Sequence, residues 1–237
     1  MAVVDRLNPI IELLRHSPGR VNKVFVQKER GPGRLAEVVR EARTHSVPFV
    51  FVPKNVLDRM SRHHQGALAE TAAKEYSSVE DILTDSKNPF VVLLDGIEDP
   101  QNLGAVIRSA ECAGADGVIL PEHRSAGLTE TVETVSAGAL ARIKVARVTN
   151  LVPVIEDLKD RGLSVVGAEA SGDVRWHELD FTRPVALVLG SEGRGLRPLV
   201  RRSCDNVVFI PLAGAVNSLN VAAAAAVLFF EVVRQRK

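Results

Sequence analysis

Hydrophobic positions in the first third of the chain follow two alternating periods. Some stretches place apolar side chains at helical spacing, and others are short β-branched or aromatic runs typical of strands. This alternation predicts a small α/β unit. The predicted elements are helices at 4–15, 34–45 and 55–62, and strands at 21–27, 47–52 and 68–76.

Beyond residue 90 the alternation becomes more regular. The strand candidates here are continuously apolar, which is typical of a parallel sheet covered by helices on both faces. They lie at 90–95, 117–120, 144–148, 163–168, 184–190 and 206–212, with helices predicted at 103–113 and 151–161. The polar segment TDSKNP at 84–89 ends in a proline and is typical of a linker. We therefore expect an N-terminal domain at 1–84, a linker at 85–89 and a second domain at 90–237.

The C-terminal segment NSLNVAAAAAVLFFEVVRQ, residues 217–235, predicts a capped apolar helix. Ser and Asn accept hydrogen bonds from the free amides at a helix start, and alanine allows close packing. A helix this apolar is expected to be buried, with the positive end of its dipole in the interior. That end suits a small molecule or an anion, although an ordinary core helix has the same pattern.

Composition places the chain among soluble globular proteins. Of 237 residues, 46% are hydrophobic and 25% charged. No apolar run reaches the roughly 20 residues that a membrane span requires, and the N-terminus lacks the layout of a signal peptide. Cys112 and Cys204 lack metal-ligand spacing, which favours buried thiols in a reducing compartment. We expect a cytoplasmic protein with no membrane association.

Charge is distributed unevenly along the chain. Residues 1–77 hold 13 Lys and Arg against 8 Asp and Glu, whereas residues 78–237 hold 17 against 21. A basic module joined to a slightly acidic one suggests an arm that binds a polyanion beside a catalytic body. Scattered charge on a solvated surface is the alternative explanation.

Three polar, glycine-rich segments each follow an apolar strand, where ligand sites of parallel sheets gather. The first contains Asn102 and Arg108, the second is GSEGRGL from Gly190, and the third runs from Phe209 into the C-terminal helix. None is a phosphate-binding P-loop, a dinucleotide fingerprint or a hydrolase elbow. No His/Cys cluster has the spacing of a zinc site, so no metal is expected.

Together and in this order, the three segments resemble the SpoU (TrmH) family of RNA ribose 2′-O-methyltransferases. NLGAVIRSAECAG resembles the first motif of that family, LVLGSEGRGL the second and IPLAGAVNSLNVAAAAAV the third. The resemblance spans nearly all of residues 90–237. The N-terminal part, with HHQG at 63–66, resembles the RNA-binding domain of the ribosomal RNA guanosine branch.

The resemblance implies a parallel α/β SPOUT methyltransferase domain with a C-terminal trefoil knot, preceded by a small α/β RNA-binding domain. It implies a homodimer with each active site at the interface, and S-adenosylmethionine as methyl donor. Backbone groups of the donor pocket are expected at Leu189, Gly190, Ile210, Leu212 and Leu219. The implied catalytic set is Asn102, Arg108, Glu192, Ser218 and Asn220.

Arg108 is the residue expected to act in catalysis. A sulfonium donor reacts by in-line attack, so the enzyme must chiefly position a ribose hydroxyl and assist its deprotonation. The family proposal makes this arginine a general base, but a guanidinium rarely releases its proton. We favour a clamp on the adjacent phosphate that stabilises the developing oxyanion. For Asn102 and Ser218, capping of a helix is the alternative to a contact with substrate or donor, and Glu192 could contact Asn102 or the partner subunit.

The expected substrate is a guanosine ribose in large-subunit ribosomal RNA. A tRNA ribose and a non-catalytic role in ribosome assembly are the alternatives. His63, His64 and Gln65 are interpreted as residues of a loop that faces RNA. With few aromatic side chains, RNA affinity should rest on phosphate contacts and be sensitive to salt.

Overall fold

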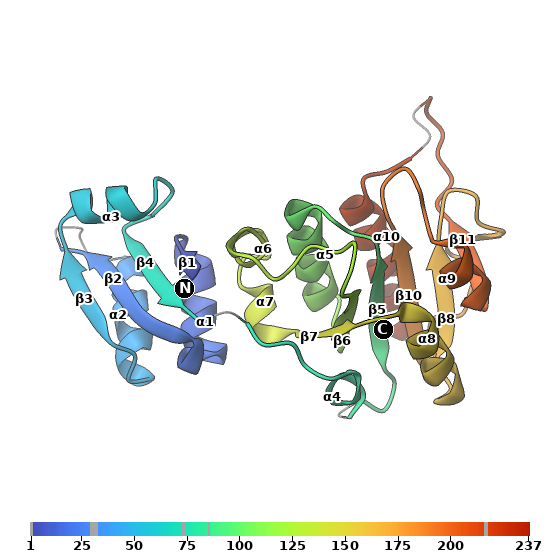
Figure 1. Cartoon of the computed structure of the whole chain (residues 1–237), viewed down its shortest axis with the longest axis horizontal. Helices are drawn as coiled ribbons and strands as arrows, with labels where there is room; N and C mark the ends of the chain where they lie inside the picture. The colour runs from blue at the N-terminus through green and yellow to red at the C-terminus, as the bar shows by residue number, and fades with distance from the viewer. Residues whose placement is uncertain (1, 29–32, 73, 85, 216–217) are drawn as a thin grey trace. The chain divides into compact units, whose positions relative to one another are not determined.

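The computed structural model in Figure 1 describes residues 2–28, 33–72, 74–84, 86–215 and 218–237. Its contacts divide the chain into two compact units. The first comprises residues 1–75 and 128–142, and the second comprises 76–127 and 143–237. This division differs from the predicted domains, and residue 85 of the predicted linker lies outside the described residues.

The first unit is built on a four-stranded sheet in the order β1-β4-β2-β3. Its strands are β1 (Ala2–Val4), β2 (Val21–Gln27), β3 (Phe49–Val52) and β4 (Ala67–Thr71). β4 is antiparallel to β1 and β2, and β2 is parallel to β3, so β1, β2 and β3 end at the same edge.

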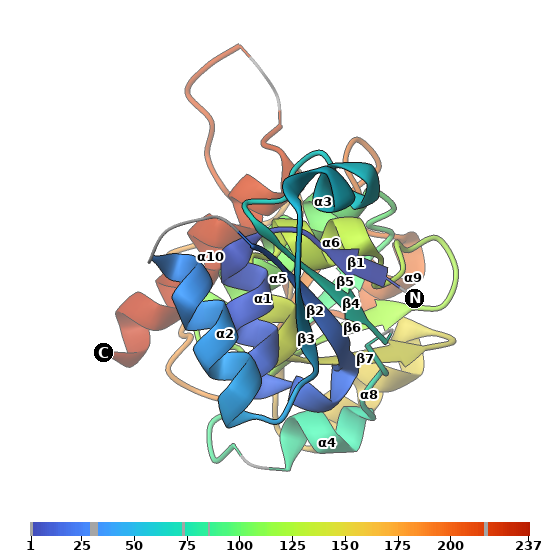
Figure 2. The same cartoon turned by 90° about the vertical axis from the view of Figure 1, so that its left-hand side faces the viewer.

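Helices α1 (Leu7–His16) and α2 (Arg34–Thr44) lie side by side (Figure 2) and share one core with the sheet of the first unit. Val24 and Val26 of β2 are buried in that core, as the alternating pattern of the strand predicts. The short α3 (Lys54–Met60) follows β3, and a 3₁₀ turn η1 (Pro18–Arg20) precedes β2.

Residues 128–142 also belong to the first unit, although they lie between two strands of the second unit in sequence. They form α6 (Glu130–Val135) and α7 (Ala139–Arg142). Ala141 is buried in the first core, and its carbonyl accepts a hydrogen bond from Ser17 at 3.2 Å. Arg20 and Glu133 form an ion pair of 3.1 Å. This insertion was not predicted, because a few short helical turns carry little periodic signal.

The second unit holds a seven-stranded, fully parallel sheet in the order β7-β6-β5-β10-β8-β11-β9. All six residues of β5 are buried, which explains its continuous apolar run, because helices cover both faces. The strands are β5 (Phe90–Asp95), β6 (Gly117–Pro121), β7 (Lys144–Val148), β8 (Ser164–Ala168), β9 (Val174–Arg175), β10 (Val185–Gly190) and β11 (Asn206–Phe209).

One face of this sheet packs against α5 (Pro100–Cys112) and α10 (Val221–Arg236), which also contact each other. Phe90 of β5 meets Phe229 of α10 edge to face, with ring centroids 5.7 Å apart. The opposite face packs against α4 (Val79–Leu83), α8 (Leu151–Asp160) and α9 (Pro198–Ser203). Residues 76–84 join this unit because Ile82 of α4 is buried in its core, and because Ser77 donates its amide to Val145 at 2.8 Å.

The helix α10 is only half buried, which corrects the prediction of a fully buried helix. Ala223, Val227 and Phe230 lie on one side of α10 and are exposed, with Phe230 at 49%. The expectation of buried thiols is likewise wrong for Cys112, which is exposed. Cys204 is largely covered, and this burial raises the pKa of its thiol to about 12. Within the described residues, no helix is both long and apolar enough to span a membrane.

Candidate active site

A cavity of about 340 Å³ lies at the carboxyl edge of the second sheet. The parallel register brings the ends of β8 and β10 together there, with Leu189 opposite Ala168, and β11 continues beyond Val208 on the other side of β8. Segments that follow these strands form the wall, together with the start of α10. The residues that line the cavity include Glu169, Leu189, Gly190, Glu192, Gly195, Ile210, Leu212, Ser218 and Leu219.

The turn after β10 folds tightly because two of its glycines have no room for a side chain. A Cβ on Gly190 would lie 2.2 Å from the carbonyl carbon of Gly195. Gly195 has φ of +66°, and a Cβ there would lie 2.1 Å from Oε1 of Glu169. Ser191 and Gly195 exchange backbone hydrogen bonds of 3.1 and 3.0 Å, which close the turn.

A buried carboxylate anchors the far end of this turn. Asp95, the last residue of β5, is 1% exposed. Its side chain accepts hydrogen bonds from the backbone amide of Arg197 at 2.8 Å and from Nε of Arg197 at 2.5 Å. The 190–197 segment is therefore fixed at both ends to neighbouring strands.

Three predicted catalytic residues form one polar cluster at the mouth of the cavity. Oε1 of Glu192 accepts hydrogen bonds from Nδ2 of Asn220 at 2.6 Å and from Nδ2 of Asn102 at 3.3 Å. The amide of Val221 also donates to this oxygen at 3.3 Å. Nδ2 of Asn220 donates to Oδ1 of Asn102 at 2.9 Å. The cluster joins the starts of α5 and α10 to the 190–197 turn, and it confirms the predicted contact between Glu192 and Asn102.

The capping alternatives for Asn102 and Ser218 are wrong. α5 begins after Asp99, whose carboxylate accepts from the amide of Gln101 at 2.9 Å, and Asn102 lies inside the first turn. α10 is capped by Asn220, whose Oδ1 accepts from Ala222 N at 2.9 Å. Ser218 instead lines the cavity, and Asn217, where the predicted turn begins, lies outside the described residues.

Arg108 does not line this cavity within a single chain. Its side chain is exposed, and among the described residues it has neither an ion pair nor a hydrogen bond. It lies six residues beyond Asn102 on α5, roughly 9 Å along the helix axis. The single chain therefore brings together four of the five predicted catalytic residues and leaves the arginine on the outer surface of α5.

All five residues predicted for the donor pocket, Leu189, Gly190, Ile210, Leu212 and Leu219, line the cavity. Glu169 was not predicted, although it lines the same cavity and accepts from Nε of Arg201 at 3.0 Å. Glu169 directly follows β8, so the rule that ligand sites lie at strand ends could have identified it.

In the first unit, His64 and Gln65 hold the loop that contains them. Nδ1 of His64 accepts from Gly66 N at 3.2 Å, so its Nε2 carries the proton and donates to Asp58 at 2.8 Å. The ring is 5% exposed. Oε1 of Gln65 accepts from the amide of Leu7 at 3.3 Å. His63 and Gln65 are exposed, as expected of residues in a loop that faces RNA, whereas His64 is not.

Among the described residues, no three His, Cys, Asp or Glu side chains gather as a metal site would require.

Comparison with known proteins identifies the family. A family model described as the SpoU rRNA methylase family matches residues 89–230. The chain belongs to the SpoU rRNA methylase family. A second model, described as RNA 2′-O ribose methyltransferase substrate binding, matches residues 7–77.

Relatives of this family member extend over almost its whole length. It is 41% identical over 234 residues to the putative TrmH family tRNA/rRNA methyltransferase YacO of Bacillus subtilis, covering 97% of this chain and 94% of that protein. It is 35% identical to the 23S rRNA (guanosine-2′-O-)-methyltransferase RlmB of Shewanella oneidensis, covering 99% and 98%.

A solved structure supports the same assignment. The SpoU methyltransferase AviRb from Streptomyces viridochromogenes, crystallised in complex with the cofactor AdoMet, aligns with a TM-score of 0.81 and 29% identity. The alignment covers 99% of this chain and 89% of that one. These neighbours confirm the predicted fold class, a parallel-sheet SPOUT domain with a small preceding domain. The trefoil knot stays a prediction.

Proposed function

We propose that this protein transfers a methyl group from S-adenosylmethionine to a ribose 2′-hydroxyl of RNA. The observation that carries the proposal is the cavity of the second unit, because segments of the second and third sequence motifs wall it and Asn102 of the first motif joins its mouth. AdoMet in the AviRb structure and the RNA methyltransferase relatives support the same reaction.

The cavity fits a nucleoside-sized donor. Its volume of about 340 Å³ falls in the range of small-molecule sites, about 300–1,000 Å³. Leu189, Ile210, Leu212 and Leu219 give apolar walls for an adenine, and Gly190 lets the backbone approach closely. When bound, S-adenosylmethionine supplies an electrophilic methyl group on a sulfonium.

The residues of the chain then have to hold the ribose. Glu192, Asn102 and Asn220 are already locked together by hydrogen bonds, so their positions are set before RNA arrives. Ser218 lies on the cavity wall, where its hydroxyl can bond donor or substrate. We assign Arg108 the role of clamping the phosphate next to the target ribose and stabilising the developing 2′-oxyanion.

A homodimer completes this assignment. The exposed apolar side of α10, with Val227 at 37% and Phe230 at 49% exposed, needs cover that a single chain does not give. α10 packs along α5, which carries the exposed Arg108. We propose that two copies pair through these helices and that the partner subunit's Arg108 faces the cavity.

For the substrate, we propose a guanosine ribose of 23S ribosomal RNA. The support is the near full-length similarity to the Shewanella oneidensis enzyme of that name. The name of the Bacillus subtilis relative includes both tRNA and rRNA, so a tRNA ribose is the second candidate. The expected cytoplasmic location stays a prediction.

Two measurements test the proposal. Calorimetry with S-adenosylmethionine should show binding, whereas a non-catalytic RNA-binding factor should give no heat. Mass mapping of ribose methylation in rRNA and tRNA from a deletion strain should reveal one missing 2′-O-methyl group that returns with the gene. A full set of ribose methyl groups in the deletion strain would refute the assigned reaction.

A further inference from the structure

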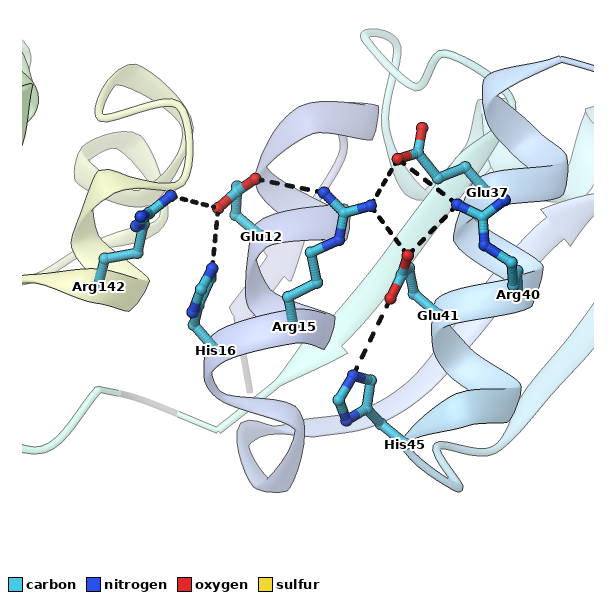
Figure 3. A network of polar contacts seen from close by, with 8 residues as sticks. All are labelled: Glu12, Arg15, His16, Glu37, Arg40, Glu41, His45 and Arg142. Carbon is cyan, nitrogen blue, oxygen red and sulfur yellow. Dashed lines mark hydrogen bonds and ion pairs between the residues drawn. The ribbon is translucent and has the colours of Figure 1, made fainter.

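Two groups of cations in the first unit differ in their partners. On α1 and α2, Arg15 pairs with Glu37 at 2.7 Å and Glu41 at 2.9 Å, and Arg40 also reaches Glu41 at 3.5 Å. Figure 3 shows this network, which includes Glu12 as well. Three of the acids of the unit are therefore neutralised on the helical face.

The second group lies at one edge of the sheet, which we call the α3 edge. Its members are Arg6, Lys28, Arg34, Lys54, Arg59 and Arg62. All six side chains are exposed, and in the described part of the chain none has an ion pair or a hydrogen bond. Of the nearby acids, Asp58 is bonded to His64, and Asp5 is 7% exposed and accepts from Ser61.

Topology brings these six residues together. β1, β2 and β3 all end at this edge, and α1, α2 and α3 begin there, because each helix follows one of those strands. Backbone bonds fix the arrangement: Lys28 donates to Val52 at 3.0 Å, and Gln27 donates to Gly66 at 2.8 Å. The loop braced by His64 closes the edge between α3 and β4.

Placing cations here opposes local helix electrostatics. Arg6 is the N-cap of α1 and Arg34 the first residue of α2, where the positive end of the helix dipole disfavours a cation. Neither N-cap side chain accepts from its own helix, although Gln65 accepts from the Leu7 amide of α1. The first turn of α1 has no acid, and Glu37 in the first turn of α2 pairs with Arg15. Charges that oppose their own helices are explained if a polyanion covers this edge, because phosphates would then bind both the side chains and the helix ends.

We infer that the α3 edge is the surface on which the RNA substrate docks, with its phosphates against these six cations. This inference rests on the proposed function and adds the site within the first unit. Phe51, on the edge strand β3 and 49% exposed, directly precedes Val52 at this edge and offers a ring on which one base can stack. HHQG braces the docking surface, and its His64 does not itself contact RNA.

The test uses the full-length protein with a triple charge reversal, Lys54→Glu, Arg59→Glu and Arg62→Glu. The matched control is Lys87→Glu, Arg183→Glu and Arg202→Glu, which changes net charge equally at exposed positions of the second unit, near the amino ends of its strands. Binding of a labelled, mixed-sequence single-stranded RNA is followed by fluorescence anisotropy over a salt series.

Three lost phosphate contacts should reduce the slope of log K against log salt by about 2, which corresponds to roughly 100-fold weaker binding near 0.1 M salt. The control should stay within about threefold of wild type. Phe51→Ala should weaken binding about tenfold without changing the salt slope. The triple variant should bind S-adenosylmethionine and unfold thermally like wild type, since its three cations have no partner among the described residues. Phe51→Ala loses an edge-to-face contact with Phe49, so its control is unchanged binding of S-adenosylmethionine.

The inference is overturned if the triple variant keeps the affinity and salt slope of wild type, or if the control loses as much affinity. Either result leaves the proposed function intact as long as wild type binds and methylates RNA. If wild type neither binds nor methylates RNA, the proposed function itself fails. The two failures are therefore distinguishable in one set of measurements.

Discussion

Replacing Gly190 with alanine should abolish the donor cavity while leaving the rest of the second unit folded. The added Cβ would lie 2.2 Å from the carbonyl carbon of Gly195 and 2.5 Å from the amide nitrogen of Leu196. Both atoms belong to the backbone, so no side-chain rotation relieves the overlap. Carbon atoms pack at about 3.5–4.0 Å, so the turn must retreat by more than about 1 Å.

Moving the turn away from residue 190 would strain the hydrogen bonds that close it. The two backbone bonds between Ser191 and Gly195 would be lost or stretched, at about 0.5–1.5 kcal/mol each, and overpacking adds about 1–3 kcal/mol. We expect a loss of about 2–6 kcal/mol in the free energy of unfolding, or a melting temperature lower by roughly 5–20 °C. Affinity for S-adenosylmethionine should fall more than about 100-fold, because Gly190 and Gly195 both line the cavity.

Two neighbouring glycines provide matched controls. Gly193 has φ of +75° but no atom within 4 Å of an added Cβ, so Gly193→Ala carries backbone strain alone, about 1 kcal/mol. Gly214 has neither constraint, and Gly214→Ala should be neutral. Calorimetry and thermal unfolding of the three variants check the series. Wild-type affinity and melting temperature in Gly190→Ala would refute the steric reasoning, and equal losses at Gly190 and Gly193 would assign the effect to backbone strain instead.

Three further changes test other parts of the molecule. Arg108→Lys keeps the positive charge but loses the planar guanidinium that can donate two parallel hydrogen bonds to a phosphate. Single-turnover methylation should therefore slow about 10–100-fold at unchanged affinity for S-adenosylmethionine, and a normal rate rules out the phosphate clamp. Phe230→Asp should dissociate the dimer in analytical ultracentrifugation, and a variant that stays dimeric contradicts pairing through α10. Burial lowers the pKa of Lys74 to about 8, and the positive charge of Arg20 contributes to the same shift. The native state therefore loses this proton at a lower pH than the unfolded state does. Stability in urea should therefore rise between pH 8 and about 10, by at most ~3 kcal/mol, and Lys74→Met should remove the rise; a wild-type curve flat over that range contradicts the assignment.

Long periodic elements and motif-bearing segments could be predicted from the sequence. The strands at 21–27, 90–95 and 144–148 match the structure at both ends. The five apolar pocket residues follow from the rule that sites lie at the ends of parallel strands. Short elements such as α4, α6, α7 and α9 were missed, since a helix of one or two turns depends on tertiary packing more than on periodicity.

Two errors have physical causes that composition does not reveal. The apolar sequence of α10 predicted a buried helix, but an apolar helix face can also be covered by a second chain. Only the folded structure shows which side of α10 is exposed in one chain. His64 was interpreted as a residue that faces RNA, whereas its ring is 5% exposed and bonded to Asp58, six residues earlier in the chain. A polar residue near a predicted binding loop can brace that loop without touching the ligand.

The membership of residues 128–142 in the first unit affects how the protein can be dissected. The backbone passes between the two units three times, after residues 75, 127 and 142. A fragment starting at residue 76 would strip α6 and α7 of their packing partners and expose Ala141 to water. To isolate the second unit as a folded fragment, residues 128–142 would have to be deleted and the end of β6 joined to the start of β7 by a short linker.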